Sequence, residues 1–315
     1  MNAFDWIAQL VGMLAAVLAA PLFLGWVNQC RAWLQNKSAP SILLPYRGIR
    51  KLFHKDAVIA ANASQLFRLA PYVVFGAMVT AAAIIPSIAT RLPFTQAADA
   101  IALVGLFATA RMFVSLAAMD VGTAFGTLGA RREMMIGFLA EPALLMVIFV
   151  AALISGTTAL PAISELLATQ SLALYPSLAF TAVAFTMVLL AENARIPIDN
   201  PATHLELTMI HEALLIEYSA RHLALMEWAA ALKLFNYVCI GIALFIPWGL
   251  ATSQAPPGLA VSALFLAAKL ALAGAGIALI ETLSAKLRVF RAPEFLATAF
   301  LLAVLGLLVR LLLGA

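Results

Sequence analysis

The sequence contains few charged residues and few cysteines. Only 11% of its 315 residues are charged and 64% are hydrophobic, whereas about 25% of the residues of a typical soluble domain are charged. This composition excludes a soluble enzyme and predicts an integral membrane protein. The two cysteines, Cys30 and Cys239, form no CxxC pair, so thiolates of this chain cannot assemble an iron-sulfur cluster or a zinc site.

Long apolar segments divide the chain into membrane spans and loops. A spanning helix needs about 20 mostly apolar residues, and this length predicts an all-α, polytopic fold with about eight transmembrane helices in one integral membrane domain, residues 1–315. The expected spans are residues 4–27, 66–89, 98–121, 134–155, 172–192, 234–253, 259–283 and 294–313.

The basic residues indicate how these spans are oriented. Fourteen lysines and arginines lie in the first, third, fifth and seventh loops, against two in the other loops and the C-terminal end. Because cytoplasmic loops are enriched in Lys and Arg, we expect both termini on the periplasmic side of a bacterial inner membrane.

The first loop, residues 31–56, contains a predicted amphipathic helix over residues 45–55. At 100° per residue its basic side chains, including Arg47, Arg50 and Lys51, fall on one side and its apolar side chains on the other. This pattern favours an interfacial helix lying on anionic lipid. A docking edge for a cytoplasmic partner is the alternative.

The fifth loop, residues 192–233, is unusually polar for this chain, with six of the fifteen acidic residues and three of the four histidines. Pro197 and Pro201 predict an extended start, with helix resuming over residues 202–218. Carboxylates that are half-sheltered from water have raised pKa values, which suits a proton relay. A metal site is not favoured, because His211 and Glu212 open like HExxH but the fifth position is leucine.

Charged side chains also occur within the expected spans, where each costs roughly 2.5–3.5 kcal/mol at mid-helix. These residues are Arg68, Arg111, Asp120, Glu141, Lys269 and Glu281. Glu141 stands out because Pro142 follows it and frees a backbone carbonyl one turn earlier. It is either a functional carboxylate or the partner of Arg111 or Arg68 in a structural ion pair.

The segment Glu192–Glu212, ENARIPIDNPATHLELTMIHE, resembles the loop that characterises the membrane subunit of formate hydrogenlyase and related energy-converting nickel-iron hydrogenases. That family is similar in turn to membrane subunit 1 of respiratory complex I. Further matches are LFRLAP at residues 66–71, GARRE at 129–133, AEP at 140–142 and EYS at 217–219. Complex I relatives carry additional acids where this chain has Ala202 and His204, which favours the hydrogenase branch.

The resemblance implies a non-catalytic membrane subunit of an oxidoreductase complex. The hydrogenase large subunit and its iron-sulfur partner would dock on loops one, three and five. They would hold the nickel-iron centre and the clusters, while this chain binds no cofactor. Antiporter-like membrane subunits and the lipid bilayer are the other expected partners, and no nucleic acid is expected. The alternatives are the quinone-site subunit of an NADH dehydrogenase-like complex and a stand-alone ion transporter.

The resemblance also assigns roles to single residues. Matched by position, the proton path consists of Glu141, Glu192, Asp199, Glu206, Glu217 and Glu227, to which we add Glu212, a residue without a counterpart in the complex I relatives. The expected charge partners are Arg68, Arg132 and Arg195. The amphipathic helix of the first loop and the histidines of the fifth loop, and not the resemblance, provide the expected docking contacts: Arg47, Arg50, Lys51, His204 and His211.

Overall fold

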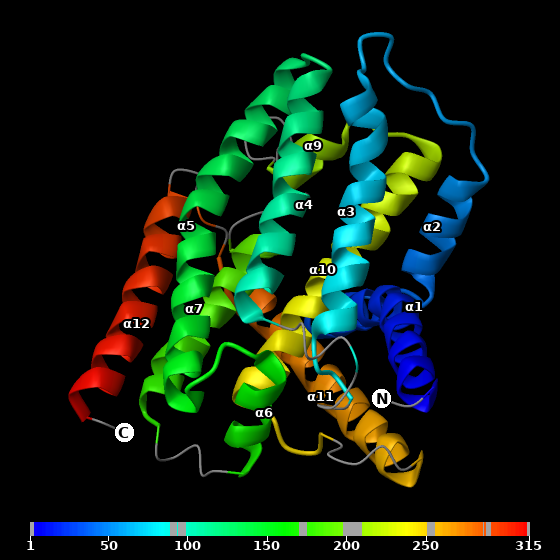
Figure 1. The fold of residues 1–315 in the computed structure, drawn as a ribbon. Helices are drawn as coiled ribbons and strands as arrows, with labels where there is room; N and C mark the ends of the chain where they lie inside the picture. The colour runs from blue at the N-terminus through cyan, green and yellow to red at the C-terminus, as the bar shows by residue number, and fades with distance from the viewer. Residues whose placement is uncertain are drawn as a thin grey trace.

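The computed structural model describes residues 3–88, 93, 99–169, 175–197, 210–250, 256–285, 287 and 291–313. In this part of the chain all regular elements are helices, and the only strand-like feature is an isolated antiparallel bridge between Asp99 and Ala159. The helices are α1 (Ala3–Leu34), α2 (Leu44–Phe53), α3 (Gln65–Ile84), α4 (Ala100–Asp120), α5 (Ala124–Ser155), α6 (Leu160–Thr169), α7 (Ser177–Glu192), α9 (His211–Leu215), α10 (Ala220–Phe245), α11 (Pro256–Leu283) and α12 (Ala292–Leu313) (Figure 1). The predicted all-α polytopic class is confirmed.

Within the described residues, seven helices are long and apolar enough to cross a membrane: α1, α3, α4, α5, α10, α11 and α12. The expected span 172–192 corresponds to α7, an apolar helix of 16 residues. The start of α1 and the end of α12 lie on the same side of the bundle (Figure 1). This arrangement agrees with an even number of crossings when α7 is counted as the eighth.

The expected boundaries of the sixth span were wrong. That span was placed at residues 234–253, but α10 begins at Ala220 and ends at Phe245. A hydropathy criterion stops at charged side chains such as Glu227 and Lys233. The helix continues through both, and Lys233 is accommodated because it meets a carboxylate of α7.

Pro21 lies inside α1 and has no N–H to donate to the carbonyl of Val17. The indole of Trp228 on α10 donates to that carbonyl at 2.9 Å, and the hydroxyl of Tyr46 on α2 donates to the next carbonyl, of Leu18. In lipid an unpaired backbone carbonyl costs several kcal/mol. The indole of Trp228 thus satisfies the carbonyl that Pro21 frees and ties α10 to α1, and Tyr46 ties α2 to the same turn.

Pro71 has the same consequence in α3, where it frees the carbonyl of Phe67. The hydroxyl of Tyr218, just before α10, donates to this carbonyl at 3.1 Å, and the rings of Tyr218 and Phe67 stack with centroids 4.1 Å apart. Burial, together with the Asp120 carboxylate, raises the pKa of Tyr218 above its ordinary value, so the hydroxyl stays a donor.

The predicted helix at residues 45–55 is present as α2, which is amphipathic: Ile49 is buried, while Arg47, Arg50 and Lys51 are exposed. Helix α2 packs against α1 and α10. The same loop is tied to the segment before α10, because Ser219 Oγ accepts from the Val58 amide at 2.9 Å and donates to the Val58 carbonyl at 2.6 Å.

Lys269 of α11 does not neutralise an acid in a neighbouring helix within the described residues. Its ammonium group donates to the carbonyls of Ile246, at 2.6 Å, and Trp248, where α10 has just ended. A cation at a helix C-terminus compensates the free carbonyls and the negative end of the helix dipole. Lys269 is therefore a helix-capping residue.

Candidate functional site: a buried ion cluster around Arg111

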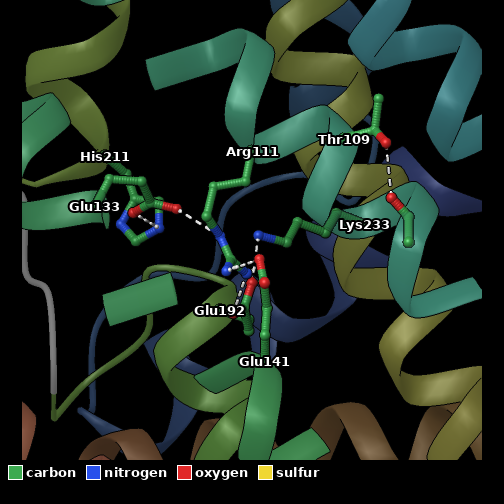
Figure 2. Close-up of polar contacts among 8 residues, drawn as sticks. Thr109, Arg111, Glu133, Glu141, Glu192, His211 and Lys233 are labelled. Atoms are coloured by element: carbon green, nitrogen blue, oxygen red, sulfur yellow. Dashed lines mark hydrogen bonds and ion pairs between the residues drawn. The ribbon is translucent and has the colours of Figure 1, made fainter. Parts of the chain in front are cut away.

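The guanidinium group of Arg111 lies inside the bundle and contacts three glutamates (Figure 2). From this α4 residue, Nε lies 3.5 Å from Glu133 and Nη1 lies 2.5 Å from Glu141, both on α5, while Nη2 contacts Glu192 at the end of α7. The side chains of Arg111 and Glu192 are 6% and 1% exposed, and that of Glu141 is 34% exposed. An arginine can serve several carboxylates because its planar fork carries five N–H donors.

The local sequence of α5 explains this geometry. Glu133, Gly137 and Glu141 are spaced by four residues, so they lie along one face of the helix. A Cβ atom at Gly137 would clash with the Arg111 guanidinium. The glycine therefore provides the space in which the arginine passes between the two glutamates.

Two further side chains complete the site. The Nζ of Lys233 lies 2.8 Å from Glu192 Oε2, and His211 Nε2 of α9 lies 3.2 Å from Glu133 Oε2. Together these residues form the Arg111 cluster, which consists of Arg111, Glu133, Glu141, Glu192, His211 and Lys233. With three carboxylates and two permanent cations, the cluster has one carboxylate in excess, and a single proton neutralises it.

A cavity of about 200 Å³ adjoins the Arg111 cluster. Its lining includes the charged or polar side chains of Arg111, Glu133, Glu192, His211 and Lys233 and the apolar side chains of Val74, Met78, Phe107 and Met226. A water molecule occupies about 30 Å³ of liquid. The cavity is therefore large enough and polar enough to hold several water molecules next to the carboxylates.

A second ion cluster lies on the other side of the turn that follows α7. Glu281 of α11 contacts Arg195 at 3.0 Å through Oε1 and Arg31 at 3.4 Å through Oε2, and its side chain is 1% exposed. These three residues form the Glu281 cluster. Burial lowers the pKa of Arg195 from its ordinary value, and the Glu281 carboxylate opposes this shift.

The structure brings together only part of the predicted proton path. Glu141 and Glu192 meet at Arg111, so the ion pair considered for Glu141 is present and includes a second path residue. Glu212 is exposed, lies beside the cavity and is close enough to act electrostatically on Glu227. Glu217 is half-buried. Asp199, Glu206 and His204 lie outside the described residues.

The predicted charge partners lie at different depths in the bundle. Arg195 pairs with Glu281, while Arg68 is exposed and Arg132 is half-buried. His211 contacts Glu133 in the Arg111 cluster, and its expected contact with a docked subunit stays a prediction. The other docking candidates, Arg47, Arg50 and Lys51, are exposed.

Sequence reasoning did not assign Glu133 and Lys233 to the site and treated Arg111 only as a possible neutralising charge. The repeat Glu133-Gly137-Glu141 was a usable signal, since two acids at helical spacing flanked a glycine. Lys233 was missed because the expected span began one residue later. Nothing in the sequence pattern joins Arg111 to Glu192, which is 81 positions away.

A bundle of membrane-crossing helices with ion clusters buried between them defines an integral membrane subunit rather than a soluble module. Residues 7–312 match the family described as NADH dehydrogenase, and the chain belongs to this family, that of NADH dehydrogenase subunit 1.

Two curated relatives come from Escherichia coli (strain K12). Formate hydrogenlyase subunit 4 is 34% identical over 295 residues, which cover 92% of this chain and 94% of that protein. Hydrogenase-4 component C is 36% identical over 234 residues, which cover 74% and 73%. The resemblance to the hydrogenase membrane subunits is confirmed.

A solved structure of the membrane-bound sulfane sulfur reductase, an archaeal respiratory membrane complex, contains a chain with the same fold. The TM-score is 0.79, with 17% identity and coverage of 96% of this chain and 98% of that chain. At this identity the match shows the fold alone.

Proposed function

We propose that this chain is the membrane-anchor and coupling subunit of a formate hydrogenlyase-type nickel-iron hydrogenase complex. It docks the hydrogenase arm and provides an acidic path for protons. The relatives that cover most of the chain support the type of complex. The observation that carries the proton path is the Arg111 cluster, where three glutamates from two helices share one buried guanidinium.

The excess carboxylate makes this cluster responsive to charge nearby. One electron that arrives about 10 Å away changes the energy of a carboxylate by roughly 1.7 kcal/mol at an effective dielectric constant near 20. That energy corresponds to a little over one pKa unit. Reduction of an iron-sulfur cluster in a docked subunit therefore favours proton uptake by the Arg111 cluster, and reoxidation favours its release.

The path begins at the loops on which the arm docks. Glu212 and Glu227 lie at its exposed end, and His211 and Glu133 lead from α9 to Arg111.

Docking uses the basic surface of α2, whose Arg47, Arg50 and Lys51 are exposed. Loops one, three and five face the cytoplasm in this proposal, both termini face the periplasm, and antiporter-like subunits lie alongside in the inner membrane.

The substitution Glu192→Gln tests the path, because it keeps the shape of the side chain but cannot carry charge. In inverted membrane vesicles that contain the assembled complex and its physiological electron donor, we expect slower hydrogen evolution and slower proton movement. Hydrogen evolution from reduced methyl viologen, which supplies the arm directly, should stay unchanged. The matched control is Glu294→Gln, an exposed acid of α12 outside both clusters. Wild-type rates of both processes in Glu192→Gln would remove this residue from the path.

The second candidate is a quinone-site subunit of an NADH dehydrogenase-like complex. The family match and the apolar residues that line part of the 200 Å³ cavity favour it. Purification in mild detergent separates the candidates. Nickel and a hydrogenase large subunit in the eluate support the first function, bound quinone and an NADH-oxidising flavoprotein support the second, and a chain that purifies alone supports a stand-alone transporter.

A further inference from the structure

The chain turns sharply where α7 ends, directly after Glu192. The amide and the side-chain nitrogen of Asn193 both donate to the Leu189 carbonyl, at 3.2 and 2.8 Å, and the Arg195 amide donates to the Leu190 carbonyl at 2.9 Å. Between them Ala194 has a φ of 53°. A residue with a Cβ is disfavoured in this left-handed region, so surrounding contacts must hold the turn in place.

Helix α11 and the residues after it supply those contacts. The Glu281 carboxylate binds Arg195 at 3.0 Å, and the Leu287 amide donates to the Pro197 carbonyl at 2.9 Å. The second oxygen of Glu281 faces Arg31, in the last turn of α1 where the first loop begins. One buried carboxylate thus joins three segments that are far apart in the sequence.

This turn is shared by the two ion clusters. Glu192 belongs to the Arg111 cluster and Arg195, three residues later, belongs to the Glu281 cluster. A shift of Arg195 must move the end of α7, because the amide of Arg195 is bonded to the carbonyl of Leu190. Glu192 has little freedom to compensate, since its carboxylate already contacts both Arg111 and Lys233.

We propose that Glu281 is a positioning residue for Glu192: by holding Arg195 it fixes the end of α7, and so places the Glu192 carboxylate between Arg111 and Lys233. The proposal rests on the proposed function, because it gives the proton path a support outside the path itself. The described ion pairs of Glu281 are with Arg31 and Arg195, and neither arginine belongs to the Arg111 cluster. Glu281 therefore acts on Glu192 through the turn that follows α7.

Two substitutions separate positioning from simple charge balance. Glu281→Gln removes the charge but keeps the length of the side chain, and it leaves Arg195 and Arg31 without a carboxylate in their cluster. Glu281→Asp keeps the buried charge and shortens the side chain by one methylene group. Charge balance alone predicts that only the first change matters, whereas positioning predicts that both do.

The experiment compares hydrogen evolution and proton movement per assembled complex for Glu281→Gln, Glu192→Gln and the double variant, with Glu294→Gln as the control. We expect Glu281→Gln to lower both rates by about tenfold, as small misplacements of a functional group do. The double variant should be no slower than Glu192→Gln alone, because both changes affect the same carboxylate. Effects that multiply, or a wild-type rate in Glu281→Gln, would overturn the inference.

Two outcomes keep the inference separate from other failures. If Glu192→Gln itself has wild-type rates, the proposed proton path fails and the inference is overturned with it. If Glu281→Gln does not assemble, Glu281→Asp decides: a reduced rate per assembled complex supports positioning, and a wild-type rate overturns it.

Discussion

Replacing Arg111 by glutamine should strongly destabilise the bundle. The substitution removes the guanidinium from Glu133, Glu141 and Glu192, and two of these carboxylates have side chains that are at most 5% exposed. Breaking a buried ion pair by removing one partner costs about 3–5 kcal/mol. Lys233 remains as the only permanent cation of the cluster, and among the three carboxylates its described ion pair is with Glu192.

The assay is thermal unfolding of the purified protein in mild detergent. At roughly 2–4 °C per kcal/mol for a large domain, the expected decrease in Tm is on the order of 10 °C. Adding Glu133→Gln to Arg111→Gln should recover part of this loss, because in Arg111→Gln Glu133 loses the only permanent cation among its described partners, whereas Glu192 keeps Lys233. A Tm within about 2 °C of wild type, or a double variant less stable than Arg111→Gln, would refute this account of the cluster.

Further predictions concern the glycine of the site and the proline of α3. Gly137→Ala should destabilise the protein by about 1–3 kcal/mol, because its Cβ clashes with the arginine of the cluster, whereas Gly76→Ala, which meets no neighbouring atom, should be neutral in the same thermal assay. Tyr218→Phe should cost about 0.5–1.5 kcal/mol by removing the donor to the Phe67 carbonyl, and most of this cost should disappear in a Pro71→Ala background, where the helix supplies its own N–H. Since the pKa of Tyr218 is raised in the folded state, its contribution to stability is complete below the ordinary value of 10.0 and is lost as the pH rises through the folded-state pKa. Stability measured at increasing alkaline pH should therefore fall less steeply in Tyr218→Phe than in wild type.

The helical architecture could be predicted because lipid imposes one simple requirement. Every backbone polar group must be paired inside the bilayer, so each long apolar run has to be a helix. The boundaries were less predictable, as α10 shows: it contains Glu227 and Lys233, which a hydropathy criterion assigns to a loop. Whether a charge ends a span depends on its partner, and for Lys233 that partner lies on another helix.

The site could be predicted only in part, for the same reason. Glu141 and Glu192 were identified by position, and the possible pairing of Glu141 with Arg111 followed from the cost of a lone charge in a span. Glu133 and Glu281 could not be assigned in this way, because their partners, Arg111 and Arg195, lie on other segments of the chain. Helical periodicity relates residues within one helix and does not predict contacts between helices.

The coupling role proposed for this chain requires that carboxylates of the Arg111 cluster exchange a proton when the oxidation state of the docked arm changes. Redox-triggered infrared difference spectroscopy of the assembled complex measures this exchange, because protonated and ionised carboxyl groups absorb differently. The account predicts a carboxylic-acid band that appears on reduction, reverses on oxidation and is lost or altered in Glu192→Gln. Carboxylates that stay ionised whatever the oxidation state of the arm would contradict it.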